Sequence, residues 1–125
     1  IYDVDADIFS PNALGAVINK ATLGRLKVKV VAGGANNQLA SPDMDSALRE
    51  AGILYAPDYV INGGGIINVA AEISGEYSRS WVMDKLDVLI ETLGEVLDEA
   101  LKASLPTNLV AERIARQRIA AAKRG

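Results

Sequence analysis

The sequence predicts an α/β fold: about three short parallel strands that form one half of a doubly wound sheet, followed by two long C-terminal helices. Three segments carry this prediction, because each ends a short apolar run with glycine and small polar residues. Parallel strands end in this way where they open onto a ligand. The three segments are Asp7–Gly15, Gly33–Leu39 and Ala56–Gly65. Their alternation with helical patterns predicts one parallel sheet with a single ligand-facing edge.

The first predicted strand covers residues 6–9 and is closed by Ser10–Pro11, since the residue before proline avoids the helical region. Residues 12 to about 19 then carry apolar side chains at helical spacing, which predicts a short helix on the sheet. These side chains are Leu14, Val17 and Ile18.

The second predicted strand covers residues 26–32, where alternating apolar and basic residues give way to a wholly apolar run. Ser41–Pro42 predicts a helix start, with the hydroxyl at the N-cap and proline in the first turn, and Gly52 predicts the helix end. Residues 53–55 form the third predicted strand. Tyr59–Ile61 follows a turn and is expected to be a further extended piece.

The second half of the chain changes character. From about residue 80 to residue 104, apolar residues recur every three or four positions, which predicts a long amphipathic helix. Thr107 or Asn108 is expected to cap a second helix. The organisation expected is therefore an α/β unit over residues 1–77 and a helical segment of the same domain over residues 78–125.

Composition narrows the function. The 125 residues are 50% hydrophobic with a net charge of −3 and no basic stripe, which argues against a nucleic-acid partner. No apolar run reaches the roughly 20 residues that a bilayer requires, so we expect a soluble, cytoplasmic protein without a membrane partner. The chain has neither cysteine nor histidine, and we expect no metal site. It begins at Ile1 in what reads as a loop, which suggests an excised segment.

Asparagine and glycine are the candidate site residues. Asn36 and Asn37 follow a strand and two glycines, where each amide can offer a donor and an acceptor; a turn explains them equally well. Asn12 can contact a ligand or cap a helix. Gly63–Gly65 enters a helix, where glycine also permits close packing of backbones.

These segments, as worded, resemble a known family. Pro11-Asn12-Ala13-Leu14-Gly15, Gly33-Gly34-Ala35-Asn36-Asn37-Gln38 and Asn62–Val69 are similar to the cofactor-binding domain of the glutamate, leucine, phenylalanine and valine dehydrogenases, most closely the leucine/phenylalanine branch. The resemblance covers nearly the whole chain. It implies the C-terminal part of a Rossmann-like NAD-binding domain, because the family's phosphate-binding glycine fingerprint and substrate domain precede the matched region.

The resemblance also implies site residues. In similar enzymes an asparagine of the second segment lies between the nicotinamide carboxamide and the substrate carboxylate; we favour Asn37 slightly over Asn36. Two apolar positions on the following helix line the substrate side-chain pocket, and Ile66 and Val69 match them. The implied NAD contacts are Asn12, Ala13, Gly34, Asn36 and Asn37, and the implied substrate contacts are Asn37, Ile66 and Val69.

The function implied is NAD-dependent, reversible oxidative deamination of an L-amino acid to a 2-oxo acid and ammonia. Ile66 and Val69 favour a branched aliphatic, leucine-like substrate, since an unpaired carboxylate in an apolar wall costs several kcal/mol; leucine, valine and phenylalanine stay open, as does NAD or NADP. The family's catalytic lysines and aspartate have no match here, so the chain alone is expected to be inactive, with the parent a homo-oligomer. The alternative is a non-enzymatic α/β interaction or dimerisation module built on the two C-terminal helices.

Overall fold

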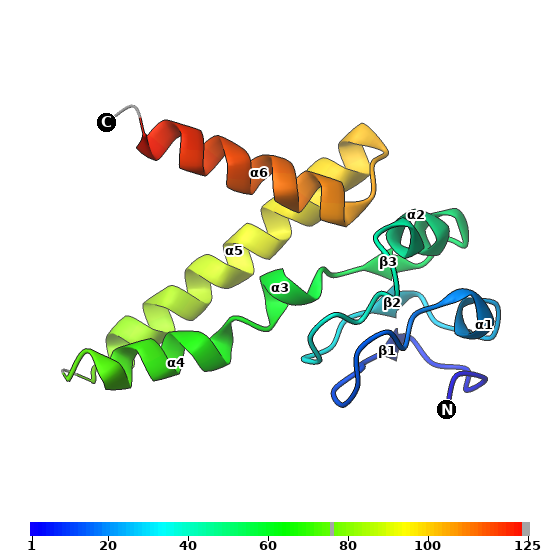
Figure 1. Ribbon diagram of the computed structural model, residues 1–125, viewed down its shortest axis with the longest axis horizontal. Coiled ribbons are helices and arrows are strands. Elements are labelled where there is room, and N and C mark those ends of the chain that lie inside the picture. The colour runs from blue at the N-terminus through cyan, green and yellow to red at the C-terminus, as the bar shows by residue number, and fades with distance from the viewer. Residues whose placement is uncertain (76, 124–125) are drawn as a thin grey trace.

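The computed structural model describes residues 1–75 and 77–123, and it combines a small sheet with a stack of long helices (Figure 1). The sheet contains strands β1 (Ile8–Phe9), β2 (Val30–Val31) and β3 (Leu54–Tyr55), all parallel and in the order β1-β2-β3. The predicted α/β architecture, a three-stranded parallel sheet followed by two long C-terminal helices, is confirmed.

The register of the sheet aligns two rows of side chains across the strands: an inner row of Phe9, Val31 and Tyr55, and an outer row of Ile8, Val30 and Leu54. Neighbouring residues of a strand point to opposite faces. The inner row therefore packs against α2 (Asp43–Glu50), whose Met44 and Leu48 are buried with it. In the outer row, Ile8 and Leu54 are 58% and 41% exposed, so that face of the sheet is largely open.

The start of α2 differs from the prediction and its end agrees. Pro42 takes the N-cap position and no side chain caps the helix, so the expected N-cap role of Ser41 is wrong. The Ser41 hydroxyl instead bonds to the Asp43 carboxylate and holds the pKa of that carboxyl below its usual value. The helix stops where Gly52 adopts a φ of 76°, a left-handed conformation that glycine reaches at little cost.

The helix predicted over residues 12–19 does not form, and α1 (Lys20–Leu23) begins only after it. Tertiary pairing overrides the apolar spacing: the Ile18 N–H donates to the Gln38 carbonyl, and the Ile18 carbonyl accepts from the Ala40 N–H. Ala16 has a φ of 57°, which a helix does not permit. Ile18 thereby enters the core completely buried, and Asn19 rather than Asn12 caps the helix.

The strands are shorter than the extended stretches that predicted them, with two paired residues each. The extended piece expected at Tyr59–Ile61 is also wrong. This segment is a single helical turn, α3 (Asp58–Ile61), because the N–H groups of Val60 and Ile61 both donate to the Pro57 carbonyl, at 2.9 and 3.1 Å.

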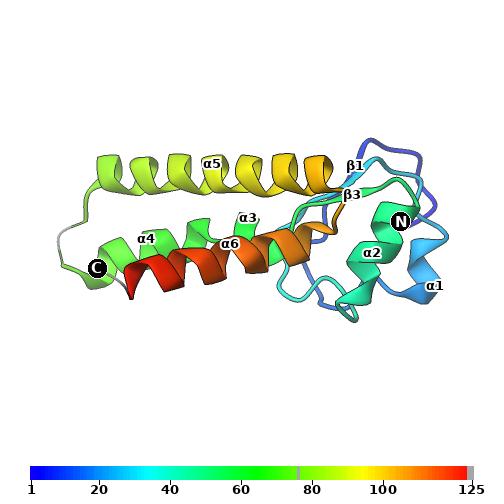
Figure 2. The ribbon, with the colours of Figure 1, turned by 90° about the horizontal axis from the view of Figure 1, so that it is seen from above.

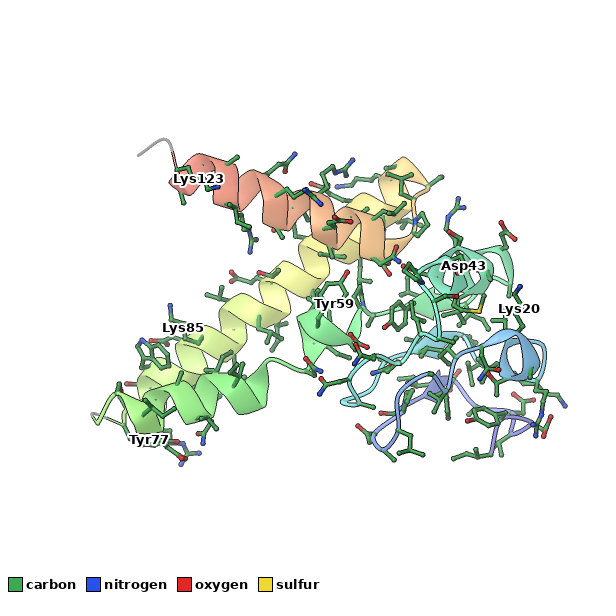
Figure 3. The ribbon with its side chains drawn as sticks, in the orientation of Figure 1. Lys20, Asp43, Tyr59, Tyr77, Lys85 and Lys123 are labelled. Atoms are coloured by element: carbon green, nitrogen blue, oxygen red, sulfur yellow. The ribbon has the colours of Figure 1, made fainter. Side chains whose placement is uncertain are left out.

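Three helices complete the molecule: α4 (Gly64–Ile73), α5 (Arg79–Ala103) and α6 (Thr107–Ala122). Figure 2 shows α5 as one layer and α3, α4 and α6 as a second layer beside it. The core between α5 and α6 contains Val96, Ala100, Val110, Ala111 and Ile114. Figure 3 places Tyr77 and Lys85 at the end of this stack far from the sheet. Within the part of the chain described, no helix is long and apolar enough to cross a membrane.

Candidate functional site

Three loops leave the sheet at the edge where its parallel strands have their carboxyl ends. The first loop (residues 10–16) follows β1, the second loop (residues 32–38) follows β2, and the third loop (residues 56–63) follows β3 and contains α3. Ligands of open α/β sheets bind at this edge. All the predicted site residues lie in the first and second loops except Ile66 and Val69, which lie on α4 just after the third.

The first and second loops touch along their backbones. The Ala35 N–H donates to the Pro11 carbonyl at 2.9 Å. Gly33 approaches so closely that a Cβ atom there would lie 2.2 Å from the Pro11 oxygen, far inside van der Waals contact. A side chain at this position would push the loops apart, so glycine is required for their contact.

Asn12 is engaged within the protein. Its amide nitrogen donates to the Ser10 carbonyl and hydroxyl oxygens, at 3.0 and 2.9 Å. Its amide oxygen accepts from the Gly34 N–H at 2.8 Å, which joins the first loop to the second. Asn12, Ala13 and Gly34 are all exposed at the edge of the sheet. The Asn12 side chain and the Gly34 N–H are thus bonded to each other rather than free to bind a ligand.

The Gln38 side chain holds the second loop from inside. It is completely buried, and its amide nitrogen donates to the carbonyl oxygens of Gly33 and Ala35, at 2.6 and 2.9 Å. The Gln38 backbone N–H donates to the buried Asp58 carboxylate at 2.8 Å. Through this bond the second loop is attached to the first residue of α3.

Asn36 and Asn37 lie side by side but in different environments. The Asn36 amide oxygen accepts from the amide nitrogen of Asn62, at the end of α3, at 2.6 Å. The Asn37 side chain makes no hydrogen bond to any residue that the structure describes, and its backbone has a φ of 53°, which asparagine tolerates. Asn37 is therefore the amide whose donor and acceptor are both open to a ligand.

Asn37 borders a groove of about 420 Å³ between the second loop, α3 and the start of α6. Tyr59 lies on its wall, and the Tyr59 hydroxyl donates to the Asn108 carbonyl at 3.3 Å (Figure 3). Polar groups of Ser41, Asp58 and Asn108 also face this groove. The edge of the sheet is thus concave and mixed in polarity, as ligand sites are.

Ile66 and Val69 lie one turn apart on α4 and share a face of the helix. They are 72% and 48% exposed, which is unusual for large aliphatic side chains on neighbouring turns. Gly63 and Gly64 let the start of α4 lie against α5, since Cβ atoms at these positions would be 2.8 and 3.3 Å from leucine methyl groups there. Gly63 and Gly64 therefore pack closely against α5, whereas a Cβ atom at Gly65 would meet nothing within 4 Å.

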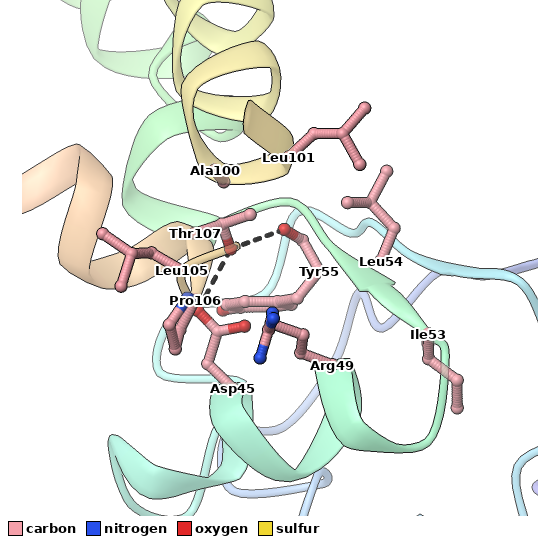
Figure 4. Close-up of a pocket in the computed structure, with 10 residues that line it drawn as sticks. All are labelled: Asp45, Arg49, Ile53, Leu54, Tyr55, Ala100, Leu101, Leu105, Pro106 and Thr107. Carbon is pink, nitrogen blue, oxygen red and sulfur yellow. Dashed lines mark hydrogen bonds between the residues drawn. The ribbon is translucent and has the colours of Figure 1, made fainter. Parts of the chain in front are cut away.

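The helical stack is fixed to the sheet by a buried polar cluster (Figure 4). The Asp45 carboxylate on α2 accepts from the backbone N–H of Asn108 at 2.7 Å and lies 3.1 Å from the Thr107 hydroxyl. That hydroxyl is also 2.7 Å from the Tyr55 carbonyl oxygen on β3. Asp45 therefore caps α6 from another element and replaces the cap expected from Thr107 or Asn108.

Burial shifts the pKa of two ionisable groups near this edge. Burial raises the pKa of Asp45, and it also raises the pKa of the Tyr55 hydroxyl well above its usual value. Tyr55 stays protonated at neutral pH, and its oxygen accepts from the Asp58 N–H at 3.3 Å. Across residues 1–75 and 77–123, no cluster of three or more acidic side chains could hold a metal ion. What the edge offers is amides, backbone groups and aliphatic surface, which orient ligands.

Sequence reasoning missed three buried polar residues: Gln38, Asp45 and Asp58. Gln38 follows two asparagines, Asp45 lies between Met44 and Ser46, and Asp58 directly follows proline at a helix start. That context is the only local signal they give. The carboxylates of Asp58 and Asp45 bond to N–H groups 20 and 63 residues away along the chain, which no local pattern reveals, whereas the Gln38 side chain bonds to carbonyl groups three and five residues earlier.

The chain is similar to a family of known enzymes. A family model described as glutamate/leucine/phenylalanine/valine dehydrogenase matches residues 1–124. The leucine dehydrogenase of Thermoactinomyces intermedius is 51% identical over 119 residues, covering 95% of this chain and 32% of that protein. The phenylalanine dehydrogenase of Caldalkalibacillus thermarum is 42% identical, with the same coverage.

A solved structure shares the fold. The crystal structure of L-tryptophan dehydrogenase from Nostoc punctiforme superimposes with a TM-score of 0.92 at 40% identity, and the match covers 100% of this chain and 37% of that one. The chain thus spans about a third of the length of the relatives it matches.

Proposed function

The chain belongs to the glutamate/leucine/phenylalanine/valine dehydrogenase family, and from this membership we propose that it forms the nicotinamide side of an NAD-binding domain. Residues 1–77 are the partial Rossmann-like unit and residues 78–125 the helical segment of the same domain. The whole enzyme would convert an L-amino acid reversibly to a 2-oxo acid and ammonia. Related proteins named for leucine, phenylalanine and tryptophan all match, so family membership leaves the substrate open.

The main support for this proposal is the position of Asn37. Its amide is free of hydrogen bonds within the described chain, it stands at the carboxyl edge of a parallel sheet, and it borders a groove. A primary amide can pair with the nicotinamide carboxamide and also donate to a substrate carboxylate. Asn36 is already bonded to Asn62, which supports Asn37 as the residue that orients both reactants. Ala13 and Gly34 add small exposed surfaces, against which a ribose can pack.

NAD, when bound, supplies the hydride acceptor. The residues of this chain fit its nicotinamide end, because the amide of Asn37, unpaired among the described residues, and the small residues Ala13 and Gly34 are exposed on the first and second loops at the carboxyl edge of the sheet. Their work is to bind and orient the reactants, since holding two reactants in position accounts for much of enzymatic rate enhancement. Proton transfer belongs to the lysines and aspartate that the family places outside the matched region.

We further propose a branched aliphatic substrate. Ile66 and Val69 give an aliphatic, uncharged wall that stands open beside the third loop, and leucine dehydrogenases are among the most similar relatives found. A difference of one methylene in such a wall discriminates by about 1 to 3 kcal/mol. That range is enough to rank leucine, valine and phenylalanine as substrates.

A chimera tests the proposed function. Residues 1–124 of this chain replace the matching third of the leucine dehydrogenase from Thermoactinomyces intermedius, whose 51% identity favours a folded hybrid. We expect NADH formation with leucine and valine, and slower turnover with phenylalanine. A chimera that folds, as circular dichroism shows, and yet forms no NADH with any L-amino acid would refute the proposal. The unaltered relative serves as the positive control.

A further inference from the structure

Gln38 holds the second loop in one shape through a buried side chain. Its two amide protons go to the carbonyl oxygens of Gly33 and Ala35, which lie five and three residues earlier in the chain. These bonds fold the backbone around a glutamine that is 0% exposed, directly beside Asn36 and Asn37. A buried, bonded amide specifies geometry in a way that an apolar side chain cannot, because each donor has one direction.

Asp58 joins this loop to α3. Its carboxylate accepts from the Gln38 N–H at 2.8 Å, and the residue is 7% exposed. At the other end of α3, Asn62 donates to Asn36 at 2.6 Å. A single helical turn is therefore bonded at both ends to the loop that carries Asn37.

The helical turn α3 leads directly into α4. Residue 61 ends α3 and residue 64 begins α4, so only two residues separate the bonded turn from the helix that carries Ile66 and Val69. We propose that Gln38 and Asp58 are positioning residues, which set the distance between the Asn37 amide and the Ile66–Val69 wall and thereby select the length of the substrate side chain. The inference rests on the proposed function.

Kinetics of the chimera test the role in selectivity. Gln38→Met keeps the volume but removes both donors, and Asp58→Ala removes the acceptor. For both we expect kcat/KM for leucine to fall by about 100-fold, because displacements near 1 Å have costs of that size. We also expect the preference for leucine over phenylalanine to narrow by about tenfold. Asp58→Asn keeps an acceptor oxygen and should retain the preference.

Thr107→Val is the matched control. It removes a buried hydrogen bond between α6 and β3, and so lowers stability without touching either loop. All variants are assayed below their melting temperatures, and Thr107→Val should keep the preference of the unaltered chimera. An unchanged ratio of kcat/KM values in Gln38→Met and Asp58→Ala, or an equal narrowing in Thr107→Val, would overturn the positioning role.

Amide hydrogen exchange on the 125-residue chain tests whether Gln38 and Asp58 hold the second loop against α3, and it requires no enzymatic activity. In Gln38→Met we expect faster exchange together at the hydrogen-bonded N–H groups of Ala35, Gln38 and Ile67, at least tenfold above the unaltered chain, with β1 unaffected. Unchanged exchange at the start of α4 would show that the second loop and α4 move independently, which overturns the positioning role of Gln38. If the folded chimera forms no NADH but exchange rises as expected in Gln38→Met, the proposed function is refuted and the link between the second loop and α4 stands.

Discussion

Gly33 shows how the absence of one side chain determines the packing of the loops at the edge of the sheet. Its lack of a Cβ atom lets the second loop touch the first, at a distance that any other residue would lengthen. Gly94, by contrast, is an exposed residue in the middle of α5, and nothing lies within 4 Å of a Cβ atom added there. The same residue type is therefore needed at one position and unfavourable at the other.

We expect Gly33→Ala to lower the free energy of unfolding by about 1–3 kcal/mol, because the loops must separate to admit the methyl group. Gly94→Ala should raise it by about 0.5–1 kcal/mol through helix propensity. Urea denaturation of both variants measures these changes. Equal stabilities for Gly33→Ala and the unaltered chain would show that the loops yield without cost.

Replacing each asparagine by aspartate distinguishes the roles of Asn36 and Asn37. Asn37→Asp tolerates the left-handed backbone but replaces the amide donor, so in the chimera we expect kcat/KM to fall by about 100-fold. Asn36→Asp keeps the oxygen that accepts from Asn62 and should lose less than about threefold. Steady-state kinetics with leucine compare the two. The opposite ranking would transfer the reactant-orienting role to Asn36.

At the scale of elements, the cap that Asp45 provides decides how α6 meets the sheet. Asp45→Ala leaves the Asn108 N–H without its partner, and we expect a loss of about 1–2 kcal/mol in the free energy of unfolding. Asp45→Asn retains an acceptor and should lose far less. Chemical denaturation at one pH ranks the three proteins, and an Asp45→Ala variant as stable as the unaltered chain would exclude the cap.

The same carboxyl gives a pH dependence whose sign follows from burial. Because the pKa of Asp45 is raised in the folded state, folding takes up a proton, and the group contributes most below its unfolded pKa. That contribution is lost as pH rises through the folded pKa. The stability of Asp45→Asn relative to the unaltered chain should therefore improve over the pH range above about 4, the usual pKa of an aspartic acid. A difference that stays constant over this range would contradict the raised pKa.

At the scale of the whole molecule, the proposed cofactor site lacks its phosphate-binding side in this chain. The sequence has no G-x-G-x-x-G fingerprint, which elsewhere cradles the pyrophosphate at a helix N-terminus. We expect the 125-residue chain to bind NAD far more weakly than low micromolar and to turn over no leucine. Calorimetric titration with NAD measures this, with the T. intermedius enzyme as the control. A low-micromolar dissociation constant would contradict it.

The chain also exposes apolar surface on both of its parts. Ile8 and Leu54 lie on the open face of the sheet, and Met83 and Ile90 lie two turns apart on α5, 49% and 64% exposed. We expect the isolated chain to self-associate, through its helices more than its sheet, because helix packing buries more apolar area. Ile90→Lys should then weaken association more than Leu54→Lys in sedimentation experiments. A strictly monomeric chain at high micromolar concentration would exclude self-association.

Local patterns were enough to predict most of the elements. Gly52 as a helix stop, the amphipathic run that became α5 and the glycine-rich entry to α4 are written in adjacent residues. The errors occurred where distant segments compete for the same backbone. Ile18 pairs with the second loop rather than forming a helix, and Asp58 begins a helical turn where an extended piece was expected.

By itself, the sequence determined the α/β class and the family, and it predicted a ligand site at the carboxyl edge of the sheet, because apolar periodicity and short motifs depend on neighbours in the chain. Only the tertiary structure decided which asparagine is free, what caps α6 and how the second loop is attached to α3. Each of these depends on a hydrogen bond between segments brought together by packing, and its partner has no fixed spacing in sequence. The geometry of the site is therefore a property of the folded chain.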